Sequence, residues 1–218
     1  MKTMIAIPCG EFAPIQFLSS MIGLRRTGET HINFKSGSLV YDNRNLLAID
    51  AITNGADRIL WIDSDMKFDP DMMQTLSADM DENPEIDMIC GIFFRRKILT
   101  EPVIYSELEP PDIDQDYNVT PHIIVMKDYP RAALFEVKGC GFGTVMMKTS
   151  VVKHVWDKFG PAFTPSAWGG EDISFCWKAR QLGFRIFCDS RVKIGHIGQA
   201  EYNEASYLSH TGGEKHGK

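Results

Sequence analysis

The strongest constraint on the fold is the alternation of short apolar segments with helical patterns along the first part of the chain. The apolar segments are residues 4–8, 31–34, 58–62 and 86–94, and amphipathic stretches separate them. This alternation predicts a mostly parallel α/β sheet, because a helix between two strands returns the chain to the same end of the sheet. Ligands bind outside the carboxyl ends of such strands, which directs attention to residues 9–10 and 63–65.

Three helices are predicted between these strands. The first begins near Pro14, the second ends at Gly55, and the third has Asp69 as its cap with Pro70 at its first position. Helical spacing predicts which side chains pack inward. These are Phe17, Leu18, Met21 and Ile22 in the first helix, and Leu46, Ile49 and Ile52 in the second.

The second half of the chain is less regular. Residues 102–130 are rich in proline and acidic residues around an apolar "HIIVM", which predicts an inserted β-hairpin or lid. Further strands are predicted at 133–137, 144–148 and 185–189, and helices at 149–159 and 171–183. We therefore expect one domain over 1–198, with the insertion at 102–130, and a polar C-terminal tail or flap over 199–218.

Composition narrows the class of protein. The chain has 218 residues, enough for one substantial core, and no window approaches the roughly 20 apolar residues of a membrane span. Five cysteines without a CxxC pair indicate neither a disulfide framework nor a zinc cluster, which favours a reducing, cytoplasmic location. The net charge of −6 argues against tight binding to bare nucleic acid. Nothing in the sequence indicates the oligomeric state.

The segment "RILWIDSDM" ends a buried strand with Asp63 and Asp65. If the strand breaks at Ser64, both carboxylates can converge, and two such charges are costly unless a cation lies between them or one carries a proton. The simplest way to offset this repulsion is a divalent cation. Carboxylate oxygens favour Mg²⁺ or Mn²⁺, and an additional imidazole ligand favours Mn²⁺. The alternative is that the two aspartates only cap a turn.

A second candidate element is "SAWGGEDISF". Glu171 and Asp172 stand at the start of an amphipathic helix, where acidic side chains also stabilise the helix dipole. The preceding Gly169 and Gly170 would let backbone approach a ligand, and Trp168 offers a stacking surface. A carboxylate there can accept a proton from an incoming hydroxyl group.

Two more elements have both a structural and a functional interpretation. His196 follows a strand in "KIGHIG", so it is expected in a turn as a further metal ligand. Arg44 begins the second helix, where it would either bind phosphate or pair with Asp42.

The basic cluster at residues 95–97 follows the strand 86–94. It is either a solvated strand end or a contact for the donor phosphates or an anionic acceptor.

In this order the elements resemble the GT-A glycosyltransferases, most closely the family-two type, and "WGGED" is similar to the motif of inverting galactosyltransferases. The matching pieces are "IAIPCG", "DNRNLLAIDAITNGADRILWIDSDM", "GCGFGTVMMKTSV", "WGGEDISFCWKARQLGF" and "GHIG".

The resemblance implies a mixed, mostly parallel sheet that binds a nucleotide sugar, UDP-linked by preference, through Mn²⁺ or Mg²⁺. The nucleoside would be bound by Pro8, Cys9 and Gly10, and further donor contacts would come from Arg44, Asp63 and Ser64. The metal ligands would be Asp63, Asp65 and His196. The sugar or acceptor would be contacted by Trp168, Gly169, Gly170 and Glu171, and Asp172 would be the catalytic base of an inverting reaction. The acidic residue often found after the first strand is absent, and Glu11 is the nearest candidate for base recognition.

Two other functions stay open at this stage. One is metal-dependent hydrolysis of a nucleotide sugar or phosphate ester, and the other is a non-catalytic nucleotide-sugar-binding module. The acceptor is unknown, either a saccharide or a hydroxylated base in nucleic acid.

Overall fold

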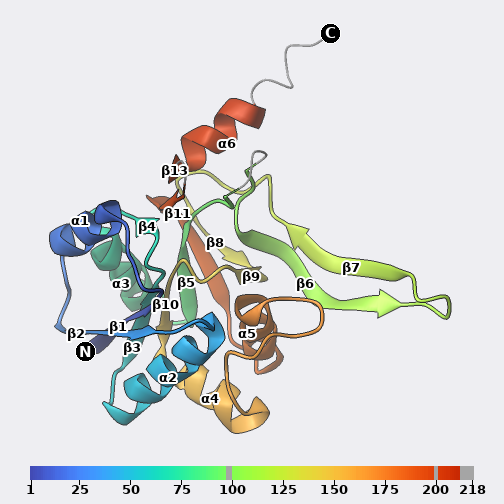
Figure 1. Cartoon of the computed structure of the whole chain (residues 1–218), viewed down its shortest axis with the longest axis horizontal. Coiled ribbons are helices and arrows are strands. Elements are labelled where there is room, and N and C mark those ends of the chain that lie inside the picture. Colours follow the sequence, from blue (N-terminus) through green and yellow to red (C-terminus); the bar gives the residue numbers. More distant parts are fainter. Residues whose placement is uncertain (97–99, 199–200, 212–218) are drawn as a thin grey trace.

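The structure, a computed structural model, describes residues 1–96, 100–198 and 201–211. In this part of the chain a seven-stranded sheet has the order β2-β1-β3-β10-β5-β11-β8, and two small sheets have the orders β13-β12-β4 and β7-β6-β9 (Figure 1). The strands are β1 (Lys2–Cys9), β2 (Glu29–Ser36), β3 (Arg58–Ile62), β4 (Met66–Lys67), β5 (Met88–Ile92), β6 (Ile104–Ile113), β7 (Val119–Val125), β8 (Leu134–Val137), β9 (Gly139–Cys140), β10 (Thr144–Lys148), β11 (Ile186–Lys193), β12 (Gly195–Ile197) and β13 (Glu201–Tyr202). The helices are α1 (Ile15–Gly23), α2 (Val40–Thr53), α3 (Met72–Glu82), α4 (Thr149–Phe159), α5 (Glu171–Gln181) and α6 (Glu204–Thr211).

The large sheet is mostly parallel, as the alternating sequence predicts. β1 runs parallel to β2 and β3, and β11 runs parallel to β5. β10 lies antiparallel between β3 and β5, and β8 is antiparallel to β11. The carboxyl ends of β1, β3 and β5 therefore meet at one edge of the sheet, where a ligand site is expected.

Helices cover both faces of this sheet. Arg58 and Trp61 are three positions apart on β3, so their side chains point to opposite faces. Arg58 donates hydrogen bonds to Ser77 and Asp81 of α3. Trp61 packs edge-on against Phe163, whose ring stacks on Phe175 of α5. Thus α3 covers one face and α5 the other, with α4 beside α5 and α2 beside α4.

The predicted insertion is a β-hairpin. β6 and β7 pair antiparallel and form an arm that projects from the body at the right of Figure 1. The Asp114 carboxylate closes its tip by accepting hydrogen bonds from the backbone N–H groups of Asp116 and Asn118. β6 also pairs with β9, which fixes the base of the arm to the body near α5.

The packed face of α2 is not the predicted one. Leu46 and Ile49 are 50% and 40% exposed, whereas Leu47, Ala48 and Ala51 are buried. The alanines let α2 lie close to β1 and β2, and this rotation also turns Arg44 inward. A similar correction applies to α1: of its four predicted inward side chains only Phe17 is fully buried, and Ile22 is 86% exposed.

The predicted start of the third helix also differs from the structure. Residues 70–71 form a turn, and α3 begins at Met72 rather than at Pro70. The Pro70 carbonyl accepts a hydrogen bond from the Arg25 backbone, which keeps it out of the helix.

The C-terminal segment is folded where it is described, as β13 and α6. Tyr207 of α6 is buried and stacks on Phe94, with ring centroids 5.1 Å apart. The rest of the predicted tail or flap, 199–200 and 212–218, lies outside the described residues.

All five cysteines are free thiols, as the sequence suggests. In the part of the chain that the structure describes, no helix combines the length and apolar character needed to cross a membrane.

Candidate functional site

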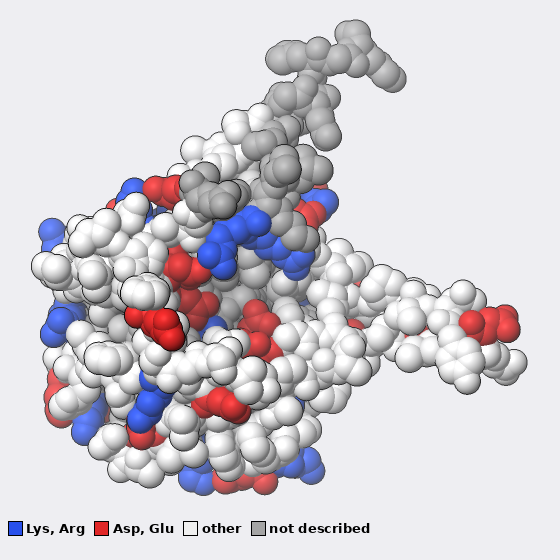
Figure 2. Space-filling model, in the orientation of Figure 1, with Lys and Arg blue, Asp and Glu red and all other residues white. Residues whose placement is uncertain are grey.

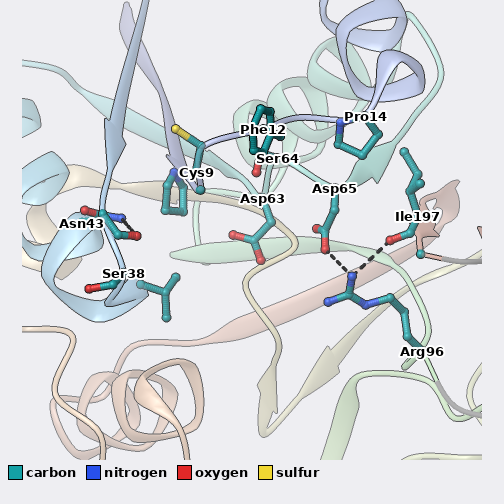
Figure 3. Close-up of a pocket in the computed structure, with 15 residues that line it drawn as sticks. Cys9, Phe12, Pro14, Ser38, Asn43, Asp63, Ser64, Asp65, Arg96 and Ile197 are labelled. Carbon is teal, nitrogen blue, oxygen red and sulfur yellow. Dashed lines mark hydrogen bonds and ion pairs between the residues drawn. The ribbon is translucent and has the colours of Figure 1, made fainter.

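The carboxyl ends of β1 and β3 form one wall of a cavity of about 480 Å³. Because β1 and β3 are neighbouring parallel strands, the residues that follow them lie side by side. Figure 3 shows the side chains that line this cavity. The lining residues are Pro8, Cys9, Gly10, Phe12, Pro14, Gly37, Ser38, Val40, Asn43, Asp63, Ser64, Asp65, Arg96, Ile197 and Gly198.

The strand does break between the two aspartates. β3 ends at Ile62, the Asp63 N–H donates to the Gly143 carbonyl, and the Met66 N–H closes a turn on the Asp63 carbonyl. This turn places Asp63 and Asp65 beside each other, with both carboxylates directed into the cavity (Figure 3). The glycine-rich segment 139–143 lies close to this turn: a Cβ on Gly143 would lie 2.6 Å from the Met66 methyl carbon.

Asp65 and His196 are in contact. His196 Nε2 lies 3.3 Å from Asp65 Oδ2, although 131 residues separate them in sequence. His196 is not in a turn, as predicted, but in β12, whose pairing with β4 carries the imidazole to the end of the aspartate turn. Its Nδ1 donates to the Phe94 carbonyl at 2.9 Å, so Nε2 is the nitrogen that faces Asp65.

A positively charged side chain, Arg96, also forms an ion pair with Asp65. Arg96 Nη1 lies 3.0 Å from Asp65 Oδ2 and donates to the Ile197 carbonyl at 3.2 Å, as the dashed lines in Figure 3 mark. Burial would raise the pKa of Asp65, but the hydrogen bond from His196 and the charges of His196 and Arg96 leave that pKa below its ordinary value.

Asp63 has a different partner. Arg44 Nη2 donates to Asp63 Oδ1 at 2.8 Å, and Arg44 Nε donates to Glu171 Oε1 at 3.3 Å. Arg44 is only 2% exposed, and its guanidinium lies over the rings of Trp61 and Phe142. The sequence predicted either phosphate or Asp42 as the partner of Arg44. The structure pairs Arg44 with these two carboxylates rather than with Asp42, and Arg44 lines a second cavity beside the first, so a phosphate contact stays a prediction.

The surroundings of Asp63 raise its pKa to about 6. Burial is the main cause, and the charges of Asp65, Asp172 and Glu171 add to it, whereas Arg44 opposes them. Three carboxylates therefore act on a fourth within one small region, where Arg44 offsets part of their charge.

A second cavity of about 440 Å³ adjoins the first and shares Val40, Asp63 and Arg96 with it. Figure 2 shows this face as a hollow with acidic side chains around its floor and basic side chains on one rim. Asp172 lines the second cavity together with Glu171 and His196. Asp172 Oδ1 accepts the Ile173 N–H at 2.8 Å. Burial, and then the neighbouring charge of Glu171, raise the pKa of Asp172.

The structure places Trp168 away from both cavities. Its indole packs edge-on against Trp177, and it lines an apolar groove with hairpin residues such as Pro110 and Ile123. The two glycines are explained by local packing: a Cβ on Gly169 would lie 2.6 Å from Ile173 Cγ2, and one on Gly170 would lie 2.9 Å from Asp172 Oδ1. Of the predicted acceptor residues, only Glu171 lines the second cavity.

Some cavity residues were not selected from the sequence. Arg95 and Arg96 were noted only as a basic cluster with two interpretations, and Lys97 lies outside the described residues. Phe12 and Asn43 line the first cavity without any sequence signal, whereas Glu11, the candidate for base recognition, does not line it.

The residues present fit a divalent cation with two protein ligands. In the described part of the chain no three His, Cys, Asp or Glu side chains form a metal-binding cluster. Asp65 and His196 nevertheless offer one carboxylate oxygen and one oriented imidazole nitrogen to the same point. Mn²⁺ accepts this donor pair, and Mg²⁺ commonly takes one or two carboxylates with water and phosphate oxygens.

The fold, with this site at the carboxyl ends of its strands, is that of the GT-A glycosyltransferases. The chain is similar to A197 from STIV, with a TM-score of 0.63 and 18% identity over 91% of this chain and 86% of that one. It is also similar to GalNAc-T7, crystallised with UDP, GalNAc and Mn²⁺ (TM-score 0.60, 10% identity, 91% of this chain and 44% of that one). A third similar structure is S. aureus TarS 1-349 (TM-score 0.52, 16% identity, 93% of this chain and 60% of that one).

At these identities the likeness is one of fold, and the chain spans less than two thirds of the GalNAc-T7 and TarS structures. No family model and no curated protein sequence matches the chain.

Proposed function

We propose that this chain is a metal-dependent, inverting glycosyltransferase that moves a sugar from a nucleoside diphosphate donor, UDP-linked by preference, to an acceptor hydroxyl. One observation carries the proposal: Asp65, which lines the first cavity, contacts His196, which lines the adjoining cavity together with Asp172. The GT-A fold, and the UDP and Mn²⁺ present in the GalNAc-T7 structure, support this assignment.

The first cavity is the proposed donor site. Pro8, Cys9 and Gly10 form the side that would face the nucleoside, and Ser64 lies at the aspartate turn. Asp65 and His196 would hold Mn²⁺ or Mg²⁺, whose chemistry here is to neutralise the negative charge of the diphosphate. Arg44 keeps Asp63 and Glu171 in place by forming an ion pair with each of them.

Asp172 is the proposed catalytic base. Its Oδ1 accepts the Ile173 N–H, which leaves Oδ2 to take the proton of the acceptor hydroxyl. The acceptor oxygen forms its bond to the anomeric carbon as the bond from that carbon to the phosphate oxygen breaks, and the electron pair leaves with the diphosphate. Attack from the face opposite the leaving group inverts the anomeric centre. The projecting hairpin β6–β7 is proposed to select the acceptor.

A thermal-shift panel tests the donor class. UDP at about 100 times its Kd with Mn²⁺ should stabilise the protein by about 2.7 kcal/mol, whereas UDP with EDTA should give little shift. GDP and ADP are the comparison nucleotides, and Asp65→Asn should remove the metal-dependent part of the shift. Equal stabilisation by all three nucleotides without metal would contradict the proposal.

A pH profile tests the environment of the base. Because the pKa of Asp172 is raised, the group becomes ionised only at higher pH than an ordinary aspartate, and kcat should rise with pH through that pKa. Glu171→Gln removes one charge that raises this pKa, so the acid limb of kcat, measured at saturating donor and Mn²⁺, should move to lower pH. Glu136→Gln, on the remote strand β8, is the control that should leave the limb in place. A limb that stays fixed or moves upward in Glu171→Gln would contradict this role.

A further inference from the structure

The Arg96 guanidinium lies at the position that a metal cation bound to Asp65 would occupy. Arg96 Nη1 and His196 Nε2 both lie against the same oxygen, Asp65 Oδ2, at 3.0 and 3.3 Å. A divalent ion held between Asp65 Oδ2 and His196 Nε2 must share this oxygen with the guanidinium or displace it. Two positive charges on one carboxylate oxygen repel each other, so displacement is favoured.

Arg96 is held weakly enough to move. Its side chain is 47% exposed, in contrast to 3% for Arg44, and an exposed ion pair is worth about 0–1 kcal/mol. Its only other hydrogen bond within the described residues is to the Ile197 carbonyl. The Asp65 side chain is itself 26% exposed, so a change of partner leaves no fully buried charge behind and costs little.

Arg96 also has a suitable second partner within reach. Its side chain lines both cavities, at the boundary where the diphosphate of a donor would pass from one to the other. A guanidinium pairs well with phosphate oxygens, often through two parallel hydrogen bonds. The same side chain can therefore neutralise Asp65 in the empty site and the diphosphate in the loaded one.

We propose that Arg96 is an internal cation that occupies Asp65 until metal and donor bind, and then transfers to the donor diphosphate. This inference rests on the proposed function. As a consequence, the binding of the metal and the binding of the nucleotide are coupled. The metal alone must compete with Arg96, whereas the nucleotide supplies a new partner for the displaced guanidinium. By linkage, UDP then tightens Mn²⁺ binding by the same factor by which Mn²⁺ tightens UDP binding.

Calorimetric titration of the full chain tests this without any turnover. Arg96→Gln should bind Mn²⁺ alone about 5-fold to 10-fold more tightly than the unmodified protein, and should bind UDP more weakly when Mn²⁺ is saturating. Arg95→Gln is the matched control, because Arg95 is adjacent and lines the second cavity but pairs with Tyr105 and Glu101. It removes the same charge and should change Mn²⁺ affinity by less than about twofold, since the effect depends on contact with Asp65.

The outcomes separate the inference from the proposed function. Mn²⁺ affinity that is unchanged in Arg96→Gln, or raised equally by Arg95→Gln, overturns the inference, while Mn²⁺-dependent UDP binding by the unmodified protein leaves the proposed function standing. Tighter Mn²⁺ binding with unaltered UDP affinity overturns the transfer of Arg96 to the diphosphate. If Mn²⁺ binds none of the three proteins, with or without UDP, both the inference and the proposed metal dependence fail.

Discussion

Asp172→Asn should lower the rate of sugar transfer about 10²-fold to 10⁴-fold, the usual contribution of a general base. Asparagine has nearly the same shape as aspartate, and its amide oxygen can still accept the Ile173 N–H, so α5 should begin as before. The amide cannot take a proton from the acceptor at neutral pH. Because Asp172 lines the second cavity and not the first, the Kd for UDP with Mn²⁺ should change by less than about twofold.

The measurements are single-turnover transfer and calorimetric UDP binding on the same preparation. Asp157→Asn, on the exposed face of α4, is a control that removes the same charge away from both cavities and from the hairpin, and should leave both quantities unchanged. An equal loss of rate and of nucleotide affinity would show that Asp172 holds the donor, and would remove it from the role of base.

Arg44→Met should destabilise the protein by about 3–5 kcal/mol, the cost of breaking a buried ion pair from one side. Methionine keeps the contacts with Trp61 and Phe142 but leaves Asp63 and Glu171 without their shared cation. The pKa of Asp63, already raised to about 6 by burial, should rise further once Arg44 no longer opposes that shift. Urea unfolding at neutral pH measures the loss.

Two comparisons make the Arg44 result specific. Arg185→Met breaks an exposed pair with Glu136 and should cost much less, because solvent screens that pair. Adding Asp63→Asn and Glu171→Gln to Arg44→Met should recover part of the lost stability, because the unpaired carboxylates are then neutral. A loss in Arg44→Met no larger than in Arg185→Met would mean that the buried pairs contribute little to the folded state.

Much of the fold followed from local pattern. Fully buried strands such as β3 and β5 are continuous apolar runs, and periodic helices separate them, so the parallel sheet was predictable. The hairpin β6–β7 was also foreseen, from a proline-rich segment around an apolar core. The helix faces were not, because in α2 small alanines, rather than the larger Leu46 and Ile49, allow close contact with the sheet.

The structure brings some of the predicted site residues together and places others elsewhere. Sequence reasoning selected Asp63, Asp65, His196 and Asp172 as chemically important, and all four line the two adjoining cavities. It assigned Trp168 to the ligand, and the structure packs that side chain against Trp177 instead. For Arg96 it left open a solvated strand end or a contact with phosphate or an anionic acceptor, because nothing within a strand end indicates which distant carboxylate an arginine will meet.

By itself, the sequence determined which segments become strands and helices and which strand ends carry acidic side chains, because hydrophobic periodicity and turn chemistry act over a few neighbouring residues. Only the tertiary structure decided the pairing of charges: Arg44 beneath Asp63 and Glu171, and Arg96 with His196 on Asp65. Coulombic contacts join groups far apart in sequence, such as Asp65 and His196, which are 131 positions apart, and only the packing of strands against one another brings such groups within hydrogen-bonding distance.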